Sequence, residues 1–283
     1  MACEDLLRKD LGEILSGFLC SIDFYMPPFD YDFSLEEPVM DHFEVQPWPE
    51  AYGKKAVKMA KWMSTGIGMC YPFADRETQI AYGIYSVYVL LICDITRELG
   101  SSMDRFAVNL VLGNPQESPV LQSLVDWLGG SLSYQGPFAA AMSIKSVIEF
   151  IRGCIIERDY DGNIALPRGA INFPEYFRSK TGIAEPFTHF CFPEALYPES
   201  EYLHVYLPAL QDICDYINHT NDILSLYKES IVGEERLTYI PNYAQTHGLS
   251  LTDALRQVCE NVGQNDFEYS NHFCRLSAVA EDN

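Results

Sequence analysis

The chain has few basic residues, and this shortage excludes several protein classes. Lysine and arginine number 19 against 40 aspartates and glutamates, so the 283 residues carry a formal net charge of −21. A protein that holds nucleic acid by its phosphates needs a positive surface, and docking on an anionic membrane is disfavoured for the same reason. An acidic protein can still bind an anion where metal cations bridge the two.

Other familiar patterns are missing as well. The nine cysteines include no CxxC pair and their number is odd, which disfavours a disulfide framework or a structural zinc site. Neither GxxxxGK[ST] nor GxGxxG occurs, so no phosphate-binding loop is predicted. The N-terminus lacks a signal-peptide pattern, and the longest uncharged apolar run, about Gln79 to Cys93, falls short of the roughly 20 residues that span a bilayer. We therefore expect a cytoplasmic protein without a membrane span and without nucleic acid as a partner.

The patterns that are present indicate helices. Hydrophobic residues make up 48% of the chain, enough for a substantial core, and alternating β-branched stretches are scarce. The apolar spacing predicts an all-α fold and one domain over residues 1–283. The expected helices are 76–99, a start at Pro119, 137–158, 174–180, 202–229 with a bend at Pro208, 250–260 and 266–276. Frequent prolines predict short helices and turns over the first 75 residues.

Two polar clusters interrupt helices that are otherwise apolar. The first ends the helix expected over residues 76–99, where Asp94 and Glu98 stand four residues apart. On a continuous helix this spacing places both carboxylates on one face, and such a pair can hold a hard cation. A solvated helix end, with Arg97 neutralising a neighbour, is the alternative interpretation.

The second cluster lies near the end of the helix expected over residues 202–229. Asn221, Ser225 and Glu229 follow the spacing i, i+4, i+8, which on an α-helix drifts only about 80° around the axis. An amide oxygen, a hydroxyl and a carboxylate in a row are hard ligands, and they suit Mg²⁺. Lys228 is close enough to meet a phosphate as a point charge. An exposed polar stripe is the alternative.

The residues Asn221-Asp-x-x-Ser225-x-x-Lys228-Glu229 resemble the second metal motif of class I terpene synthases, and in particular that of the fungal trichodiene synthase group. Arg178 is similar in position to the family's diphosphate-sensing arginine. The resemblance covers about residues 71–256, and the fold it implies is a class I terpenoid synthase helical bundle around a central apolar pocket.

What the resemblance implies about the site can be assigned residue by residue. Asp94 and Glu98 match the end of the family's aspartate-rich motif, although Ile95 stands where a second aspartate is usual. The resemblance implies a magnesium site, with metal ligands Asp94, Glu98, Asn221, Ser225 and Glu229, diphosphate ligands Arg178 and Lys228, and three Mg²⁺ ions.

The implied reaction is that of a sesquiterpene synthase, a lyase that ionises and cyclises farnesyl diphosphate with release of diphosphate. Related enzymes often form homodimers.

The C-terminus departs from the family pattern. The group carries an Arg-Tyr pair on a further C-terminal helix, and no Arg-Tyr dipeptide occurs here before the last residue, Asn283. From this we expect an incomplete C-terminus without the last helix or helices. The alternative is that another residue replaces the missing donor, and Arg275 is the candidate. The alternative function is a truncated, catalytically weak or inactive member that binds a prenyl diphosphate or a partner.

Overall fold

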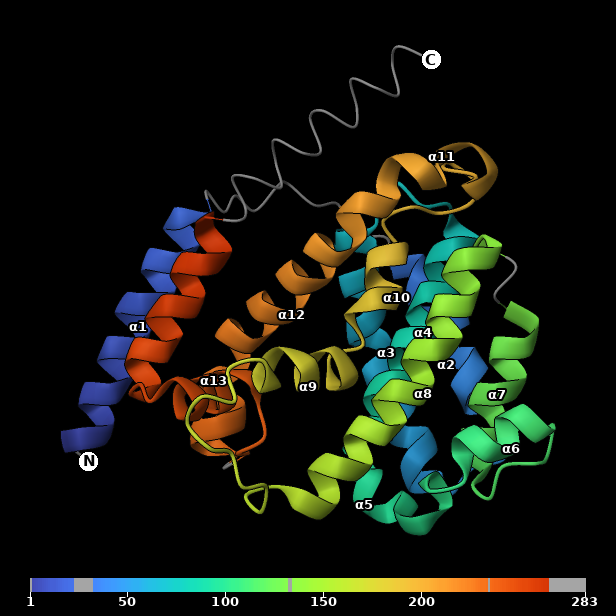
Figure 1. The fold of residues 1–283 in the computed structure, drawn as a ribbon. Coiled ribbons are helices and arrows are strands. Elements are labelled where there is room, and N and C mark those ends of the chain that lie inside the picture. The colour runs from blue at the N-terminus through green and yellow to red at the C-terminus, as the bar shows by residue number, and fades with distance from the viewer. Residues whose placement is uncertain (1, 23–32, 132–133, 234, 265–283) are drawn as a thin grey trace. The chain divides into compact units, whose positions relative to one another are not determined.

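The structure is a computed structural model that describes residues 2–22, 33–131, 134–233 and 235–264. Within these ranges the regular secondary structure is helical, and no strand occurs (Figure 1). The predicted all-α class is therefore confirmed. The chain divides into two compact units, one made of Met1–Pro27, Asp159–Ala184 and His204–Asn283, the other of Pro28–Arg158 and Glu185–Leu203. We call them unit 1 and unit 2, and the expected single domain stays a prediction.

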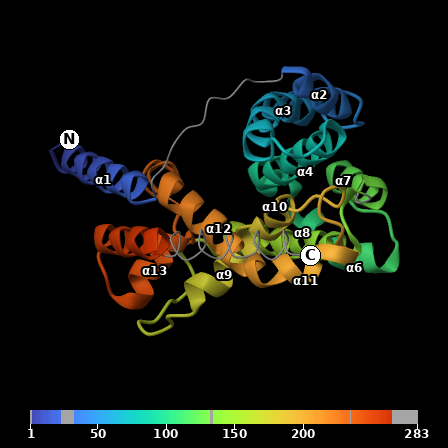
Figure 2. The same ribbon diagram turned by 90° about the horizontal axis from the view of Figure 1, so that it is seen from above.

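Unit 2 is built around helix α4, Arg76–Asp94, which α2 and α3 contact (Figure 2). Asp75 caps the start of α4, because its carboxylate accepts a hydrogen bond from the Thr78 amide at 3.0 Å. The other elements of this unit are η1 Phe33–Leu35, α2 Glu36–Glu44, α3 Glu50–Cys70, α5 Thr96–Leu99, η2 Gly100–Met103, α6 Phe106–Leu112, α7 Pro119–Ser131, nearly all of α8 Pro137–Tyr160, and α10 Ala184–His189 from its second residue.

Aromatic rings fill the core of unit 2. Tyr82, Tyr85 and Tyr88 on α4 are fully buried, and Tyr82 stacks on Phe190 with ring centroids 3.7 Å apart. Trp127 on α7 lies against Tyr85 and Tyr88. These rings contact one another, so they form a packed core in which edge-to-face and stacked pairs add to the burial of apolar area.

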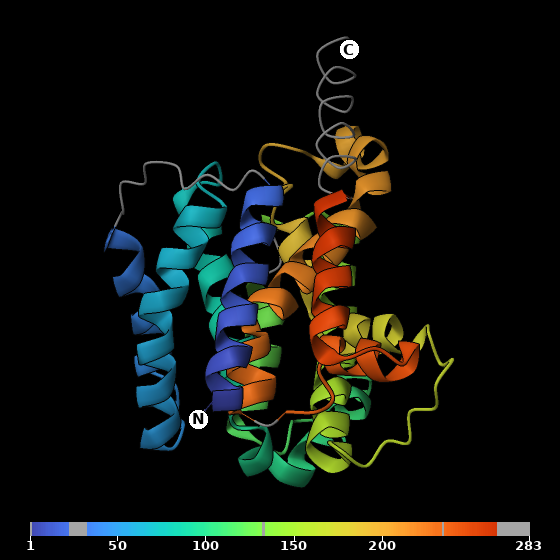
Figure 3. The same ribbon diagram turned by 90° about the vertical axis from the view of Figure 1, so that its left-hand side faces the viewer.

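Unit 1 packs its helices around α12, Leu210–Leu226. Its core combines Leu11 and Phe18 of α1, Ile223 and Leu226 of α12, and residues of α13 and of the helix over 251–264. Figure 3 shows α1, in blue, and the helix over 251–264, in red, in front of α12. The elements of this unit are α1 Ala2–Ser21, α9 Phe173–Thr181, η4 Leu207–Ala209, α12, the π-helix η5 Tyr227–Val232, α13 Tyr239–His247 and the helix over 251–264; α11 Glu199–Tyr206 begins in unit 2 and ends here.

Several predicted boundaries hold, and others do not. Helices begin at Pro119 and Pro137 as expected, and Ser250 caps the helix 251–264, since its hydroxyl oxygen lies 3.1 Å from the Asp253 amide that donates to it. The expectation of short helices before residue 75 is wrong, because α3 runs for 21 residues. The expected helix 202–229 is interrupted at Pro208 by the 3₁₀ turn η4. The expected helix 266–276 and Arg275 lie outside the described residues.

The described part contains no single helix with the length and apolar character needed to cross a membrane. Only the bent pair Arg76–Asp94 and Thr96–Met103 meets that standard, and only when both pieces are counted together. Cys20, Cys70, Cys93, Cys154, Cys191, Cys214 and Cys259 are free thiols.

Candidate active site

The chain bends sharply at the first predicted metal cluster. Helix α4 ends at Asp94, and the segment Thr96–Met103 leaves it at an angle of 72°. The side chain of Ile95 is buried at the bend, and the Thr96 hydroxyl donates to the Ile92 carbonyl at 2.8 Å, a back-bond that favours bending. The expectation of one continuous helix over residues 76–99 is therefore wrong. That Asp94 and Glu98 lie on one face stays a prediction.

The two carboxylates of this cluster have different surroundings. Asp94 is half-exposed and forms an ion pair with Lys55 of α3, with 3.0 Å between the ammonium nitrogen and the carboxylate oxygen. Glu98 on α5 is exposed. A cation that bound Asp94 would have to displace or share the Lys55 ammonium. Both residues as metal ligands stay a prediction.

The second predicted cluster faces an open hollow of about 530 Å³ along α12. Asn221, Ser225 and Lys228 all line it, together with Tyr216, Ile217, Thr220 and Leu224. The hydroxyl oxygen of Ser225 is buried and has no hydrogen-bond partner in the described part of the chain. An orphan hydroxyl beside an amide oxygen fits a hard cation, because buried polar atoms are normally paired.

Glu229 does not line this hollow. The α-helix ends at Leu226, and residues Tyr227–Val232 form a π-helix in which the Gly233 amide donates to the Lys228 carbonyl at 2.9 Å. Helices of this kind are rare and are frequent at functional sites. The π-helix has more residues per turn, so Glu229 lies at another rotation about the axis than an uninterrupted α-helix predicts. Glu229 as a metal ligand stays a prediction.

Arg178 of α9 reaches the same stretch of α12. Its Nε donates to the Asp222 carboxylate at 2.8 Å, and its Nη2 donates to the Asn221 amide oxygen at 3.1 Å and to the Asn218 carbonyl oxygen at 3.4 Å. The Arg178 and Asp222 side chains are only 13% and 5% exposed. The structure thus brings together Arg178, Asn221, Ser225 and Lys228 of the predicted site residues. Asp94 and Glu98 belong to unit 2.

The structure adds Asp222 to the site, a residue for which the sequence predicts no functional role. Burial raises the pKa of its carboxyl to about 6, while the nearby Arg178 guanidinium acts in the opposite direction. Desolvation of a buried carboxylate thus outweighs its attraction to the arginine. Spacing in the sequence gives no signal for this role, because the burial of Asp222 and its contact with Arg178 both depend on the fold.

The backbone at Gly182, just after the arginine helix, lies close to the Asn218 side chain of α12. Helix α9 ends at Thr181, and a methyl group added at Gly182 would lie 2.0 Å from the Asn218 amide oxygen. Ile183 follows with φ of +47°, in the left-handed region that β-branched residues rarely adopt. A side chain at position 182 would have to displace the Asn218 amide and would lie 2.9 Å from the Arg178 carbonyl oxygen. The strained backbone of Ile183 directly follows this end of α9.

A second contact fastens α9 to α12 one turn away. His219 Nε2 lies 3.2 Å from a Glu175 carboxylate oxygen, and the His219 ring stacks on Tyr239 of α13 with centroids 4.6 Å apart. Burial raises the pKa of Tyr239 well above its ordinary value, and the neighbouring Glu175 adds to the effect. These three residues carry no recognisable motif in the sequence, so only the structure shows that they hold the arginine helix in place.

The donor set on α12 differs from a cluster of acids. Among the described residues, no group of three or more histidines, cysteines, aspartates or glutamates is placed to hold a metal ion. The oxygens near the hollow come instead from an amide and a hydroxyl, with one carboxylate on the adjoining π-helix. Such ligands suit Mg²⁺, which takes few protein oxygens and completes its shell with water and substrate phosphates.

Arg178 contacts Asn221, and Asn221, Ser225 and Lys228 line one hollow in this helical chain. Solved structures support the same fold class: a linalool/nerolidol synthase from Streptomyces clavuligerus matches with a TM-score of 0.67 and 13% identity, covering 92% of this chain and 90% of that one. The fold is that of a class I terpene synthase.

The family can be stated more narrowly. The family model described as trichodiene synthase (TRI5) matches residues 42–272, most of the chain. The chain therefore belongs to the trichodiene synthase family. An (E)-beta farnesene synthase from Metarhizium brunneum (strain ARSEF 3297) is 38% identical over 241 residues, 84% of this chain and 72% of that protein. A trichodiene synthase from Trichoderma arundinaceum is 25% identical over 225 residues, 78% of this chain and 57% of its own length.

Proposed function

We propose that this protein is a Mg²⁺-dependent sesquiterpene synthase that ionises farnesyl diphosphate and releases diphosphate. The observation that carries the proposal is the contact of Arg178 with Asn221 and Asp222, beside a hollow lined by Asn221, Ser225 and Lys228. The identity with a farnesene synthase supports the substrate class, and a solved relative in complex with 2-fluorogeranyl diphosphate, with a TM-score of 0.64, has the same fold.

The residues of this cluster have separate roles in the proposal. Asn221, Ser225 and Glu229 would hold one Mg²⁺, and Asp94 with Glu98 would hold the others. Bound Mg²⁺ would act as a Lewis acid that neutralises the charge growing on the diphosphate as its bond to the allylic carbon breaks. Lys228 would meet a phosphate oxygen as a point charge.

Arg178 supplies directed hydrogen bonds in this scheme. A guanidinium carries five N–H donors in a fixed plane, and Asp222, Asn221 and the Asn218 carbonyl occupy only Nε and Nη2. In the described part of the chain, Nη1 has no hydrogen-bond partner. The buried Asp222 thus orients the plane, and the remaining donors can stabilise the leaving diphosphate.

The test is a product assay with matched variants. Purified protein is incubated with farnesyl diphosphate and Mg²⁺, and the volatile products are separated by gas chromatography. We expect hydrocarbons or alcohols from the unmodified protein. The rate of product formation should fall at least a hundredfold in Glu229→Ala and in Arg178→Lys. The control Asp41→Asn, at an exposed position of α2, should leave the rate unchanged. The proposed enzyme activity would be refuted if the unmodified protein formed no more product than Glu229→Ala from either farnesyl or geranyl diphosphate.

A second candidate is a diphosphate-binding member without turnover. The specific observation that favours it is Ile95, a buried side chain at the position where the family's motif usually has a second aspartate. Calorimetry separates the two functions: binding of pyrophosphate that requires Mg²⁺, without any product in the assay above, supports the second candidate.

A further inference from the structure

The loop after α8 holds the chain just beyond the π-helix of the second predicted metal cluster. One carboxylate oxygen of Asp161 accepts hydrogen bonds from two consecutive backbone amides, that of Arg236 at 3.0 Å and that of Leu237 at 2.9 Å. Hydrogen bonds to a carboxylate are stronger than those between neutral groups. Asp161 and these two residues all belong to unit 1, as does η5. The scheme proposed above gives this aspartate no role.

Gly162 lets the Arg236 side chain lie against the same loop. Its φ is +71°, in the left-handed region that favours glycine. A methyl group added at this position would lie 3.1 Å from Cδ and 3.2 Å from Nη1 of Arg236. The loop therefore meets the segment after the π-helix through the Asp161 carboxylate and through a bare stretch of backbone.

The segment that Asp161 holds is hydrogen-bonded in turn to Glu229. The Glu235 amide, directly before the two amides that the aspartate binds, donates to the Glu229 carbonyl at 3.0 Å. A second contact lies beside it, because the hydroxyl oxygens of Ser230 and Thr238 are 2.8 Å apart. The backbone of the last residue in the metal motif is thus tied to a segment whose place the aspartate fixes. A shift of that segment would move Glu229 with it.

We propose that Asp161 is a positioning residue for metal binding, which acts on Glu229 through the backbone of Glu235. By holding residues 236 and 237 it fixes the end of η5, and so keeps the Glu229 carboxylate where it binds Mg²⁺. The inference rests on the proposed function, in which Glu229 is a metal ligand. It adds a residue that lies outside the metal motif and does not touch the metal.

The test measures binding of pyrophosphate to the full chain by calorimetry over a range of Mg²⁺ concentrations, because binding does not require turnover. Asp161→Ala removes both hydrogen bonds, and we expect the Mg²⁺ concentration for half-maximal binding to rise about tenfold. Excess Mg²⁺ should restore binding, since the ligands themselves remain. Asp161→Asn keeps a carbonyl oxygen as acceptor, so its Mg²⁺ requirement should stay within about threefold of the unmodified protein.

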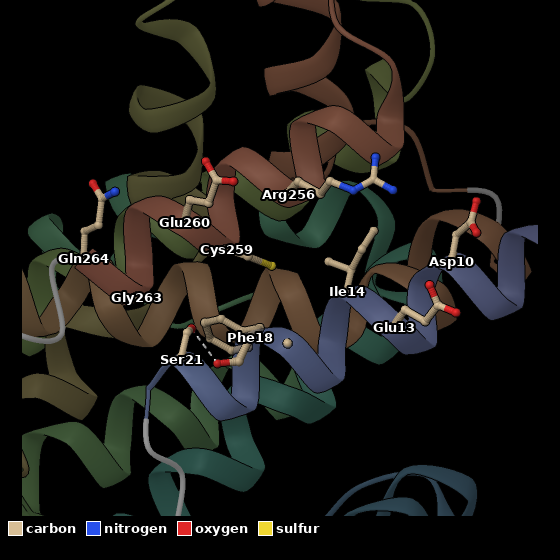
Figure 4. Close-up of a pocket in the computed structure, with 11 residues that line it drawn as sticks. Asp10, Glu13, Ile14, Phe18, Ser21, Arg256, Cys259, Glu260, Gly263 and Gln264 are labelled. Atoms are coloured by element: carbon tan, nitrogen blue, oxygen red, sulfur yellow. Dashed lines mark hydrogen bonds between the residues drawn. The ribbon is translucent and has the colours of Figure 1, made fainter.

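A matched control removes a cap elsewhere in unit 1. The Ser250 hydroxyl oxygen accepts a hydrogen bond from the Asp253 amide at 3.1 Å, at the start of the helix over 251–264. Residues of that helix line a separate hollow against α1 (Figure 4). Ser250→Ala should lower the midpoint of urea denaturation and leave the Mg²⁺ requirement unchanged. An equal rise in the Mg²⁺ requirement of this control would refute the proposal, because general destabilisation would then explain both variants.

A double variant decides whether Asp161 acts through Glu229. In the Glu229→Ala background, Asp161→Ala should raise the Mg²⁺ requirement no further, because the group that it positions is gone. A further rise of about tenfold would overturn the proposal, as would an unchanged requirement in Asp161→Ala alone.

The same measurements separate this inference from the proposed function. If the unmodified protein binds pyrophosphate with Mg²⁺ but forms no terpene product, the enzyme activity fails and the variants still test Asp161. If it binds no pyrophosphate at any Mg²⁺ concentration, both the metal site and the positioning role are refuted.

Discussion

Replacing Asp222 with asparagine should make the protein more stable and less active. The carboxylate is buried with a pKa of about 6, against 3.8 for the ordinary group. A raised pKa in the folded state means that the folded protein binds the proton more tightly than the unfolded chain does. Stability from this group is therefore greatest at low pH and falls as pH rises from about 4 to about 6. Asparagine mimics the neutral form at every pH.

The magnitude follows from the shift. A difference of roughly 2 pK units corresponds to about 3 kcal/mol of folding free energy at pH 7, where Asp222 is ionised in both states. At pH 4.5 the same linkage amounts to about 1 kcal/mol. We expect the unfolding free energy of Asp222→Asn to be higher than that of the unmodified protein. The difference should approach about 1 kcal/mol at pH 4.5 and about 3 kcal/mol at pH 7. These values already include the attraction between the carboxylate and Arg178, because that attraction lowers the pKa that burial raises.

The measurement is urea denaturation of both proteins at several pH values, with the terpene product assay run on the same samples. Asp41→Asn, an exposed carboxylate on α2, is the control and should change stability by less than about 0.5 kcal/mol. Catalytic rate should fall at least tenfold in Asp222→Asn, because the guanidinium of Arg178 loses the partner that orients it. A variant that is less stable at pH 7, or a difference that does not vary with pH, would show that the ion pair stabilises the fold.

Three further outcomes test other parts of the structure. Asn221→Leu should nearly abolish product formation and leave the helical circular dichroism spectrum intact; retained activity would mark Asn221 as structural. Gly182→Ala should cost about 1–3 kcal/mol in urea denaturation, since the new methyl group collides with the Asn218 amide, and an unchanged midpoint would contradict the close approach. Tyr85→Phe should raise the melting temperature, because the buried Tyr85 hydroxyl has no hydrogen-bond partner in the described part of the chain; a lower melting temperature would reveal a partner.

Periodicity in the sequence predicts much of the fold, but it does not predict where helices bend. The prolines that start α7 and α8 and the serine cap before residue 251 are local signals. The helix starts that they predict are confirmed by the structure. The bend after Asp94 depends on a buried Ile95 and on the back-bond from Thr96, neither of which changes the apolar spacing. For this reason a single helix over residues 76–99 was expected.

The sequence predicts the part of the candidate site whose residues belong to one continuous motif. Asn221, Ser225 and Lys228 share a hollow because all three lie near or on the regular helix α12. Asp222 was missed because its role depends on burial and on Arg178, which lies far away in the sequence. The contacts of Glu175, His219 and Tyr239 join three separate helices, and no spacing rule connects residues across such distances.

The π-helix at Tyr227–Val232 affects how this family's motif should be compared between proteins. A step of four residues turns the chain about the helix axis by a larger angle in the α-helix before Leu226 than in the π-helix after it. The reason is that each turn of a π-helix contains more residues. Two chains that align without a gap can therefore direct the same glutamate toward different points in space. Deleting a single residue between Tyr227 and Val232 would restore an ordinary turn and change the rotational phase of every residue that follows. The length of this short stretch, more than the identity of its residues, then determines where the last carboxylate of the motif is placed.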